Sequence, residues 1–217
     1  RQRQMCIRDR TYSRREVRLL VRQGRVLVNG VPARSPEDKV VPEAVEIMVD
    51  GTVLHCRRYT WIMLHKPAGV LSATEDGRGA TVLDLLPPEL RRRGLFPVGR
   101  LDKDTEGLLL LTNDGPLAHR LLAPRHHVDK TYFVRVDGEL DGADAAAFAA
   151  GMMLEDGLAC LPAGLEILSA GAESEARVTL REGKFHQIKR MLAQRGKPVV
   201  YLERIAMGNL PLDPALE

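Results

Sequence analysis

An acidic run beside an apolar segment is the stretch of this 217-residue chain best suited to chemistry. Asp102 lies two residues after Arg100 and shortly before four consecutive leucines, Leu108 to Leu111, which an Asn-Asp-Gly turn signal follows. A short apolar run bounded by a turn signal is typical of a buried strand. The spacing therefore predicts a carboxylate at the mouth of a rigid strand with a cation beside it, as a reacting acid requires. The competing interpretation is a surface carboxylate paired with Arg100 or Lys103.

The same acids fit a second kind of chemistry. The run Asp102-Lys103-Asp104-Thr105 comes close to the D-x-D-x-T pattern of magnesium-dependent aspartyl phosphatases, although the threonine here follows the second acid directly; in that pattern the first aspartate is a nucleophile and both acids bind the metal. In that pattern the buried strand precedes the acids. Here the leucines follow them, and the residues before them include Pro97 and Gly99. The order of the elements disfavours a phosphatase.

Two further stretches carry polar groups in useful positions. Tyr132 belongs to an alternating segment, where it is either a core residue or an aromatic face for a nucleic-acid base. Residues 181–197 hold six basic residues and one acid around a glycine turn that enters a helix. This pattern suits contacts with RNA phosphates, although a solvated helix face is the alternative. Within it, Lys189 could instead point inward and hold Asp102 ionised.

Composition indicates a globular protein with a basic N-terminal part. Hydrophobic residues make up 44% and charged residues 28% of the chain, and no apolar run approaches the about 20 residues of a membrane-spanning helix. The three scattered cysteines indicate free thiols in a reducing cytoplasm. Residues 1–60 carry 13 Lys and Arg against 7 Asp and Glu, whereas the remainder carries 19 against 22. A basic module on a slightly acidic body is typical of a polyanion-binding protein.

No pattern for a bound metal or cofactor stands out. The chain contains neither a Walker loop nor a dinucleotide-binding fingerprint. His126 and His127, with Asp129 close by, lack a third ligand at suitable spacing. We therefore expect no metal and no cofactor.

The N-terminal part predicts a small unit of one helix and two hairpins. Ser13 and Glu16 form a capping-box pattern, and Gly24 ends the helix that follows. Asn29-Gly30 and Asp50-Gly51 are strong hairpin signals. The expected divisions are residues 1–10, disordered or non-native; 11–54, a small basic module that looks like part of an S4-type RNA-binding module; 55–59, a linker; and 60–217, the body of the protein.

The body combines short strands with interspersed helices. We expect strands at 61–64, 108–111, 130–136 and 177–180, and helices near 82–86, at 143–150 and at 186–195. Several hairpin turns among short strands favour an α+β fold with a mixed, largely antiparallel central sheet.

These stretches, together with Leu64-His65-Lys66-Pro67-Ala68-Gly69, resemble in their order the RsuA-type branch of the bacterial rRNA pseudouridine synthases. The signature that runs from Gly99 through Asp102 and Thr105 to Gly107-Leu108 is highly specific for it. The resemblance covers residues 13–217, and the segment 123–132 is most similar to the small-subunit (16S) rRNA enzymes.

The resemblance implies an S4-like module, with its first helix missing or altered, attached to a pseudouridine synthase domain. Such an enzyme isomerises a uridine of ribosomal RNA, with Asp102 as the catalytic carboxylate. Tyr132 would pack against the base, Lys189 would pair with Asp102, and Arg100 would handle the displaced nucleotide. The expected RNA contacts are polar or cationic side chains: Arg14, Arg18, Arg22, Arg25, Lys66, Lys184, His186, Gln187 and Arg190.

The resemblance also implies the partners. We expect a cytoplasmic monomer that acts on ribosomal RNA or on a ribosomal assembly particle, without a membrane or a small-molecule cofactor. Two alternatives stay open: a large-subunit rRNA enzyme of the same branch, and a non-catalytic module for rRNA binding or ribosome assembly.

Overall fold

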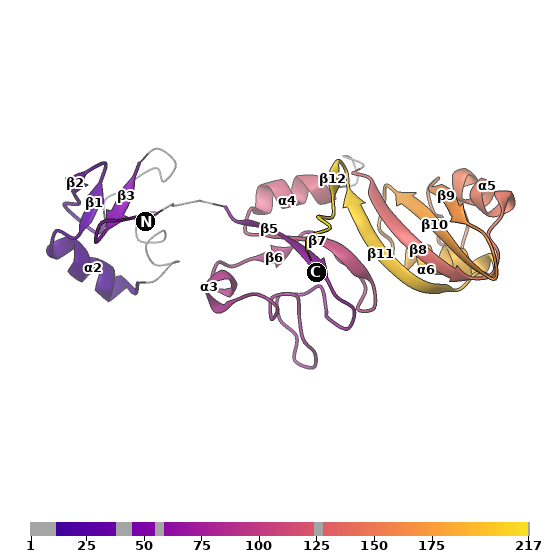
Figure 1. The fold of residues 1–217 in the computed structure, drawn as a ribbon, viewed down its shortest axis with the longest axis horizontal. Coiled ribbons are helices and arrows are strands. Elements are labelled where there is room, and N and C mark those ends of the chain that lie inside the picture. Colours follow the sequence, from indigo (N-terminus) through magenta and orange to yellow (C-terminus); the bar gives the residue numbers. More distant parts are fainter. Residues whose placement is uncertain (1–11, 38–44, 55–58, 124–127, 217) are drawn as a thin grey trace. The chain divides into compact units, whose positions relative to one another are not determined.

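A computed structural model of the protein describes residues 12–37, 45–54, 59–123 and 128–216. The predicted disordered start, residues 1–10, and all but the last residue of the predicted linker lie outside these ranges. The chain divides into two compact units. One comprises residues up to 60 together with 86–95, and the other comprises residues 61–85 and 96–217. Figure 1 shows the elements of both units.

The first unit contains the predicted helix and hairpins. Helix α2 (Arg14–Arg22) begins at the capping box of Ser13 and Glu16 and ends before Gly24, whose φ is +67°. The strands of this unit are β1 (Val26–Val28), β2 (Val31–Pro32), β3 (Ile47–Val49) and β4 (Thr52–Leu54). They pair in the order β2-β1-β3-β4, and positive φ angles at both residues of Asn29-Gly30 and Asp50-Gly51 build the turns. The predicted helix and both hairpins are confirmed.

The second unit is built on a sheet of eight strands. They are β5 (Trp61–Lys66), β6 (Phe96–Pro97), β7 (Glu106–Thr112), β8 (Lys130–Asp137), β9 (Gly164–Ser169), β10 (Glu173–Leu180), β11 (Val199–Met207) and β12 (Leu210–Pro211). The order is β5-β7-β11-β8-β10-β9, with β6 beside β7 and β12 beside β11. The β7–β11 pair is parallel and every other pair is antiparallel, so the expected mixed, largely antiparallel sheet is confirmed.

The helices of the body are α4 (Gly115–Leu122), α5 (Gly142–Ala150) and α6 (Gln187–Gln194). The predicted helices at 143–150 and 186–195 are confirmed by α5 and α6. The predicted helix near 82–86 is wrong: those residues form turns, and the short helix α3 (Pro88–Arg91) follows them. Pro88 is its first residue. Proline suits this position because the first residue of a helix needs no amide donor and because the φ of proline is already helical. None of the described helices has the length and apolar character needed to cross a bilayer.

The strand β11 was not predicted, yet it lies in the middle of the sheet between β7 and β8. Its sequence mixes charged and apolar residues, and its burial pattern is irregular. Where β11 runs beside β7, Gly107 adopts a φ of +99°, and a Cβ at that position would lie 2.4 Å from the carbonyl oxygen of Arg204. The two strands can pair there only because residue 107 has no side chain.

Candidate functional site

The loop between β6 and β7 carries Asp102 and is held by hydrogen bonds from distant parts of the chain. The Ser72 hydroxyl donates to the Leu101 carbonyl at 2.9 Å and accepts from the Leu101 amide at 3.0 Å. The Gly69 amide donates to the Lys103 carbonyl at 2.8 Å. Within the loop, the Thr105 amide donates to the Asp102 carbonyl at 3.1 Å. The backbone on both sides of Asp102 is therefore fixed before any substrate binds.

Lys66 closes the same loop from inside the protein. Its side chain is fully buried, and its ammonium donates to the carbonyls of Pro67, Lys103 and Thr105 at 3.0, 3.2 and 2.8 Å. Burial lowers the pKa of Lys66, and the nearby carboxylates of Asp104 and other acids oppose that shift. The prediction that Lys66 contacts RNA is wrong, because its ammonium has no exposed surface and supports the backbone of the loop.

Replacement of Lys66 by Met is expected to lower the free energy of unfolding by about 2 kcal/mol or more. The reason is that three buried carbonyls each lose the hydrogen bond that they accept from the Lys66 ammonium. The rate of the chemical step should fall with it, since the loop that carries Asp102 loosens. Urea denaturation and single-turnover kinetics measure the two effects. Lys103→Met, which removes an exposed lysine of the same loop, should leave the stability unchanged. Unchanged stability of Lys66→Met with weaker RNA binding would support the original prediction instead.

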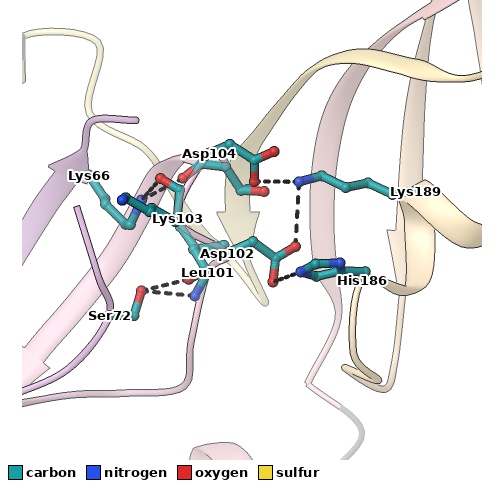
Figure 2. Close-up of polar contacts among 9 residues, drawn as sticks. Lys66, Ser72, Leu101, Asp102, Lys103, Asp104, His186 and Lys189 are labelled. Carbon is teal, nitrogen blue, oxygen red and sulfur yellow. Dashed lines mark hydrogen bonds and ion pairs between the residues drawn. The ribbon is translucent and has the colours of Figure 1, made fainter. Parts of the chain in front are cut away.

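Figure 2 shows two carboxylates of the loop facing Lys189 of α6. The ammonium of Lys189 lies 3.7 Å from an oxygen of Asp102 and 2.5 Å from an oxygen of Asp104. The bond from Lys189 lowers the pKa of Asp104. On the other side of Asp102, Nε2 of His186 lies 3.6 Å from the carboxylate. A lysine at these distances stabilises a charged carboxylate electrostatically.

The two acids differ in their surroundings. The side chain of Asp102 is 29% exposed and lines a cavity of about 470 Å³, whereas that of Asp104 is 74% exposed and does not line it. Tyr132 of β8 and Arg100 also line this cavity. Tyr132 is 8% exposed, and its hydroxyl makes no hydrogen bond within the described part of the chain. The structure therefore brings Asp102, Tyr132, Lys189 and Arg100 to one cavity.

Of the four residues predicted to contact RNA in the segment before and within α6, only His186 has a side chain beside Asp102. The Lys184 ammonium binds the Ala159 carbonyl and lies 3.0 Å from Glu182. Arg190 pairs with Asp156 at 2.6 Å. The structure does not support the prediction for Gln187: the residue lines the cavity but is only 3% exposed, and its amide bonds within the chain, with Nε2 donating to Glu182 and Oε1 accepting from the Lys184 amide.

The arginines predicted to contact RNA from the first unit lie on α2 and just after it. Arg18 and Arg22 are exposed, with Arg18 3.8 Å from Glu37. Arg25 is exposed too, and two of its nitrogens donate to Asp50, each at 2.6 Å. These bonds connect the residue just before β1 to the β3–β4 turn. The side chain of Arg14 lies outside what the structure describes.

Two residues that line this cavity, Phe185 and Ser72, and the neighbouring Arg204 were not predicted. Phe185 lines the cavity with 74% of its surface exposed, and its ring stacks on that of His186 at 3.8 Å between centroids. Ser72 holds the loop, as described above. Arg204 of β11 is 2% exposed and donates from Nε to the Leu108 carbonyl at 2.7 Å. A single aromatic residue between Lys184 and His186 was the only available signal for Phe185, and nothing local distinguishes Ser72 or Arg204.

Comparison with known proteins gives two matching families. Residues 60–194 match the profile of RNA pseudouridylate synthase, and residues 12–45 match that of the S4 domain. The RNA pseudouridine synthase YtzG of Bacillus subtilis, itself described as uncharacterized, is 47% identical over 205 residues, which cover 94% of this chain and 86% of YtzG.

Two further matches are a named ribosomal enzyme and a solved structure. Ribosomal small subunit pseudouridine synthase A of Pseudomonas aeruginosa is 41% identical over 207 residues, covering 94% of this chain and 87% of that protein. A crystal structure of a pseudouridylate synthase, 33% identical, covers 100% of this chain and 92% of its own with a TM-score of 0.69.

Proposed function

The chain belongs to the RNA pseudouridylate synthase family, and from that premise we propose that it isomerises one uridine of small-subunit ribosomal RNA to pseudouridine, with Asp102 as the catalytic carboxylate. The observation that carries the proposal is the cavity of about 470 Å³ that Asp102, Tyr132 and Lys189 line together. Similarity to ribosomal small subunit pseudouridine synthase A supports the choice of substrate.

The reaction requires access to atoms that a base stack hides. The bond from N1 of uracil to C1′ of ribose breaks, and C1′ bonds to C5, so that nothing is oxidised, reduced or hydrolysed. The target nucleotide must leave its stack, which costs a few kcal/mol. Tyr132 offers the extruded uracil an aromatic face with a free hydroxyl, and stacking on such a face is worth about 1–3 kcal/mol.

Asp102 then acts on the sugar, either by attack at C1′ or by removal of a ribose proton. Both roles need the ionised carboxylate, which the Lys189 ammonium stabilises from 3.7 Å. Arg100 is exposed at the wall of the cavity, where a guanidinium can contact the backbone of the displaced nucleotide.

The proposal extends to organisation and partners. Residues 11–54 would bind the RNA through the exposed face of α2, and residues 60–217 would catalyse the reaction. The protein would act in the cytoplasm as a monomer, on free ribosomal RNA or on an assembly particle, and without a cofactor. The phosphatase alternative is disfavoured, because the ammonium of Lys189 lies next to both carboxylates where a metal ion would be repelled.

Uridine and pseudouridine have the same mass, so the test of the proposed function is chemical. Ribosomal RNA from cells that lack or express this protein is labelled with carbodiimide and read by primer extension. We expect one stop in small-subunit RNA that depends on the protein. A dependent stop in large-subunit RNA would favour the large-subunit alternative, and RNA binding without any dependent stop would favour the non-catalytic module.

Tyr132 variants test the contact with the base. Tyr132→Ala should lower the rate of isomerisation about 10- to 100-fold, the equivalent of the stacking energy. Tyr132→Phe should lose less, because the aromatic face survives and only the hydroxyl is removed. Single-turnover assays on a transcript that contains the mapped uridine measure both rates. A rate for Tyr132→Ala equal to that of the wild type would remove Tyr132 from the site.

A further inference from the structure

A second cavity, of about 430 Å³, adjoins the cavity that contains Asp102. Both cavities are lined by Arg100, Tyr132, Gly183 and Lys184. The second one also reaches Lys130 and Arg204, neither of which lines the first. If the uracil of an RNA strand enters the first cavity, the nucleotide next to it can therefore reach the second cavity, which contains these cations.

Arg204 is a buried cation without a counter-charge among the described residues. It pairs with Tyr132 across β11 and β8 and with Gly107 across β11 and β7, and it is 2% exposed. Its Nε donates to the Leu108 carbonyl, but its Nη2 has no hydrogen-bond partner in the described part of the chain. Burying a charged group without an anionic partner is costly. The Arg204 guanidinium is therefore suited to bind an anion that is not part of the described chain.

Lys130 adds a second cation to this cavity. Its ammonium donates to the Val128 carbonyl at 3.2 Å. Burial lowers the pKa of Lys130, and the charge of Arg204 lowers it further, while Asp129 opposes the shift. Asp129 itself pairs with Arg181 at 3.1 Å.

Glu182, the acid that lines the second cavity, also has its partners within the chain. Glu182 accepts hydrogen bonds from the Leu161 amide and from Gln187, and its carboxylate lies 3.0 Å from Lys184. Within the residues that the structure describes, then, no carboxylate forms an ion pair with Lys130 or Arg204.

We propose that the second cavity is a subsite for the nucleotide next to the target uridine, with the backbone phosphate of that nucleotide bound by Lys130 and Arg204. This inference rests on the proposed function, which makes RNA the substrate. Two cations bind a phosphate well, because each forms a charge-assisted hydrogen bond with its oxygens. Leucines 121, 122 and 161 also line the cavity and offer the apolar contacts that a ribose accepts.

Neutralising one phosphate at a time tests this subsite. Synthetic RNAs cover the small-subunit segment that the protein binds, including the mapped uridine where the carbodiimide assay finds one, and each carries a single methylphosphonate at one of the successive linkages. For the wild type, one linkage adjacent to the uridine should raise the Kd and lower kcat/KM about 10- to 100-fold, as expected for loss of charged hydrogen bonds. In Lys130→Met the same methylphosphonate should have a much smaller effect, because one of its partners is already gone.

The control is Lys197→Met. Lys197 is similarly half-exposed and also donates to a backbone carbonyl, that of Glu139, but it lines neither cavity. Its sensitivity to the methylphosphonate should equal that of the wild type, and thermal melts should show that both variants fold. Arg204→Met is a weaker test, because removal of a buried side chain can unfold the protein.

Two results would overturn the inference: no sensitive linkage beside the uridine, or equal sensitivity in Lys130→Met and the wild type. Binding is measured as well as turnover, so the scan remains decisive if catalysis is absent. A wild-type protein that shows the sensitive linkage in binding but forms no pseudouridine would contradict the proposed function and leave the subsite supported.

Discussion

The Asp102→Asn variant is expected to lose isomerisation by about 10³-fold or more, while its affinity for RNA is retained. Asparagine keeps the shape of the side chain and its place in the cavity but lacks the negative charge and the basic oxygen that either mechanism needs. The binding surface is largely unaffected, because Arg100 and Lys189 remain in place. Single-turnover assays and equilibrium RNA binding measure the two properties separately.

The matched control is Asp104→Asn, since Asp104 lies two residues away and binds the same lysine more closely. We expect it to keep activity within about tenfold of the wild type, because Asp104 is exposed and does not line the cavity. Freeing Lys189 from this competitor should let it approach Asp102. Turnover of Asp102→Asn within tenfold of the wild type would refute the catalytic role, and a greater loss in Asp104→Asn would transfer that role to Asp104.

The Gly107→Ala variant is expected to lose about 3 kcal/mol or more of unfolding free energy. A methyl group at residue 107 would lie 2.4 and 2.7 Å from the backbone oxygen and nitrogen of Arg204 and 2.8 Å from Cγ of Glu203. Backbone atoms of a central strand cannot yield as a flexible side chain can. The φ of +99° adds further strain for a residue with a Cβ. Urea denaturation measures the loss.

Two other glycines separate crowding from backbone strain. Gly157 has a φ of +82°, and no atom lies within 4 Å of the place that a Cβ would take there; Gly142 has the same open space without a positive φ. Gly157→Ala should therefore cost about 1 kcal/mol, and Gly142→Ala, at the start of α5, should cost nothing. A Gly107→Ala protein as stable as Gly157→Ala would show that β7 and β11 separate easily, and that the site does not depend on their close approach.

Local signals predicted the elements that depend on a few neighbouring residues. The capping box at Ser13 and the two hairpin turns of the first unit are confirmed, because each follows from the preferences of two to four consecutive residues. The alternation from Tyr132 to Val136 likewise predicted a half-buried strand, and β8 buries those positions. The expected helix near 82–86 failed because an apolar pattern over five residues is too short to distinguish a helix from turns.

Strand β11 could not be predicted from local sequence. It is central because β7 and β8 pair with it from opposite sides, and that arrangement brings together segments almost a hundred residues apart. Its charged residues are accommodated by particular partners, such as the Leu108 carbonyl for Arg204. Neither partner nor position can be recognised from residues 199–207 alone.

The amino-acid sequence by itself indicated the class of this protein through its resemblance to one family, whereas the spacing of the acids alone left a phosphatase and a surface ion pair open. It also determined the type of fold, through the periodicity of its strands and helices. Only the tertiary structure decided which polar side chains line the cavity that contains Asp102. Lys66 and Gln187 were assigned to RNA contacts from sequence, yet both are buried and engaged, whereas Lys189 lies beside Asp102 as expected. The physical reason is that the surroundings of a side chain come from contacts between distant segments, which no local pattern contains.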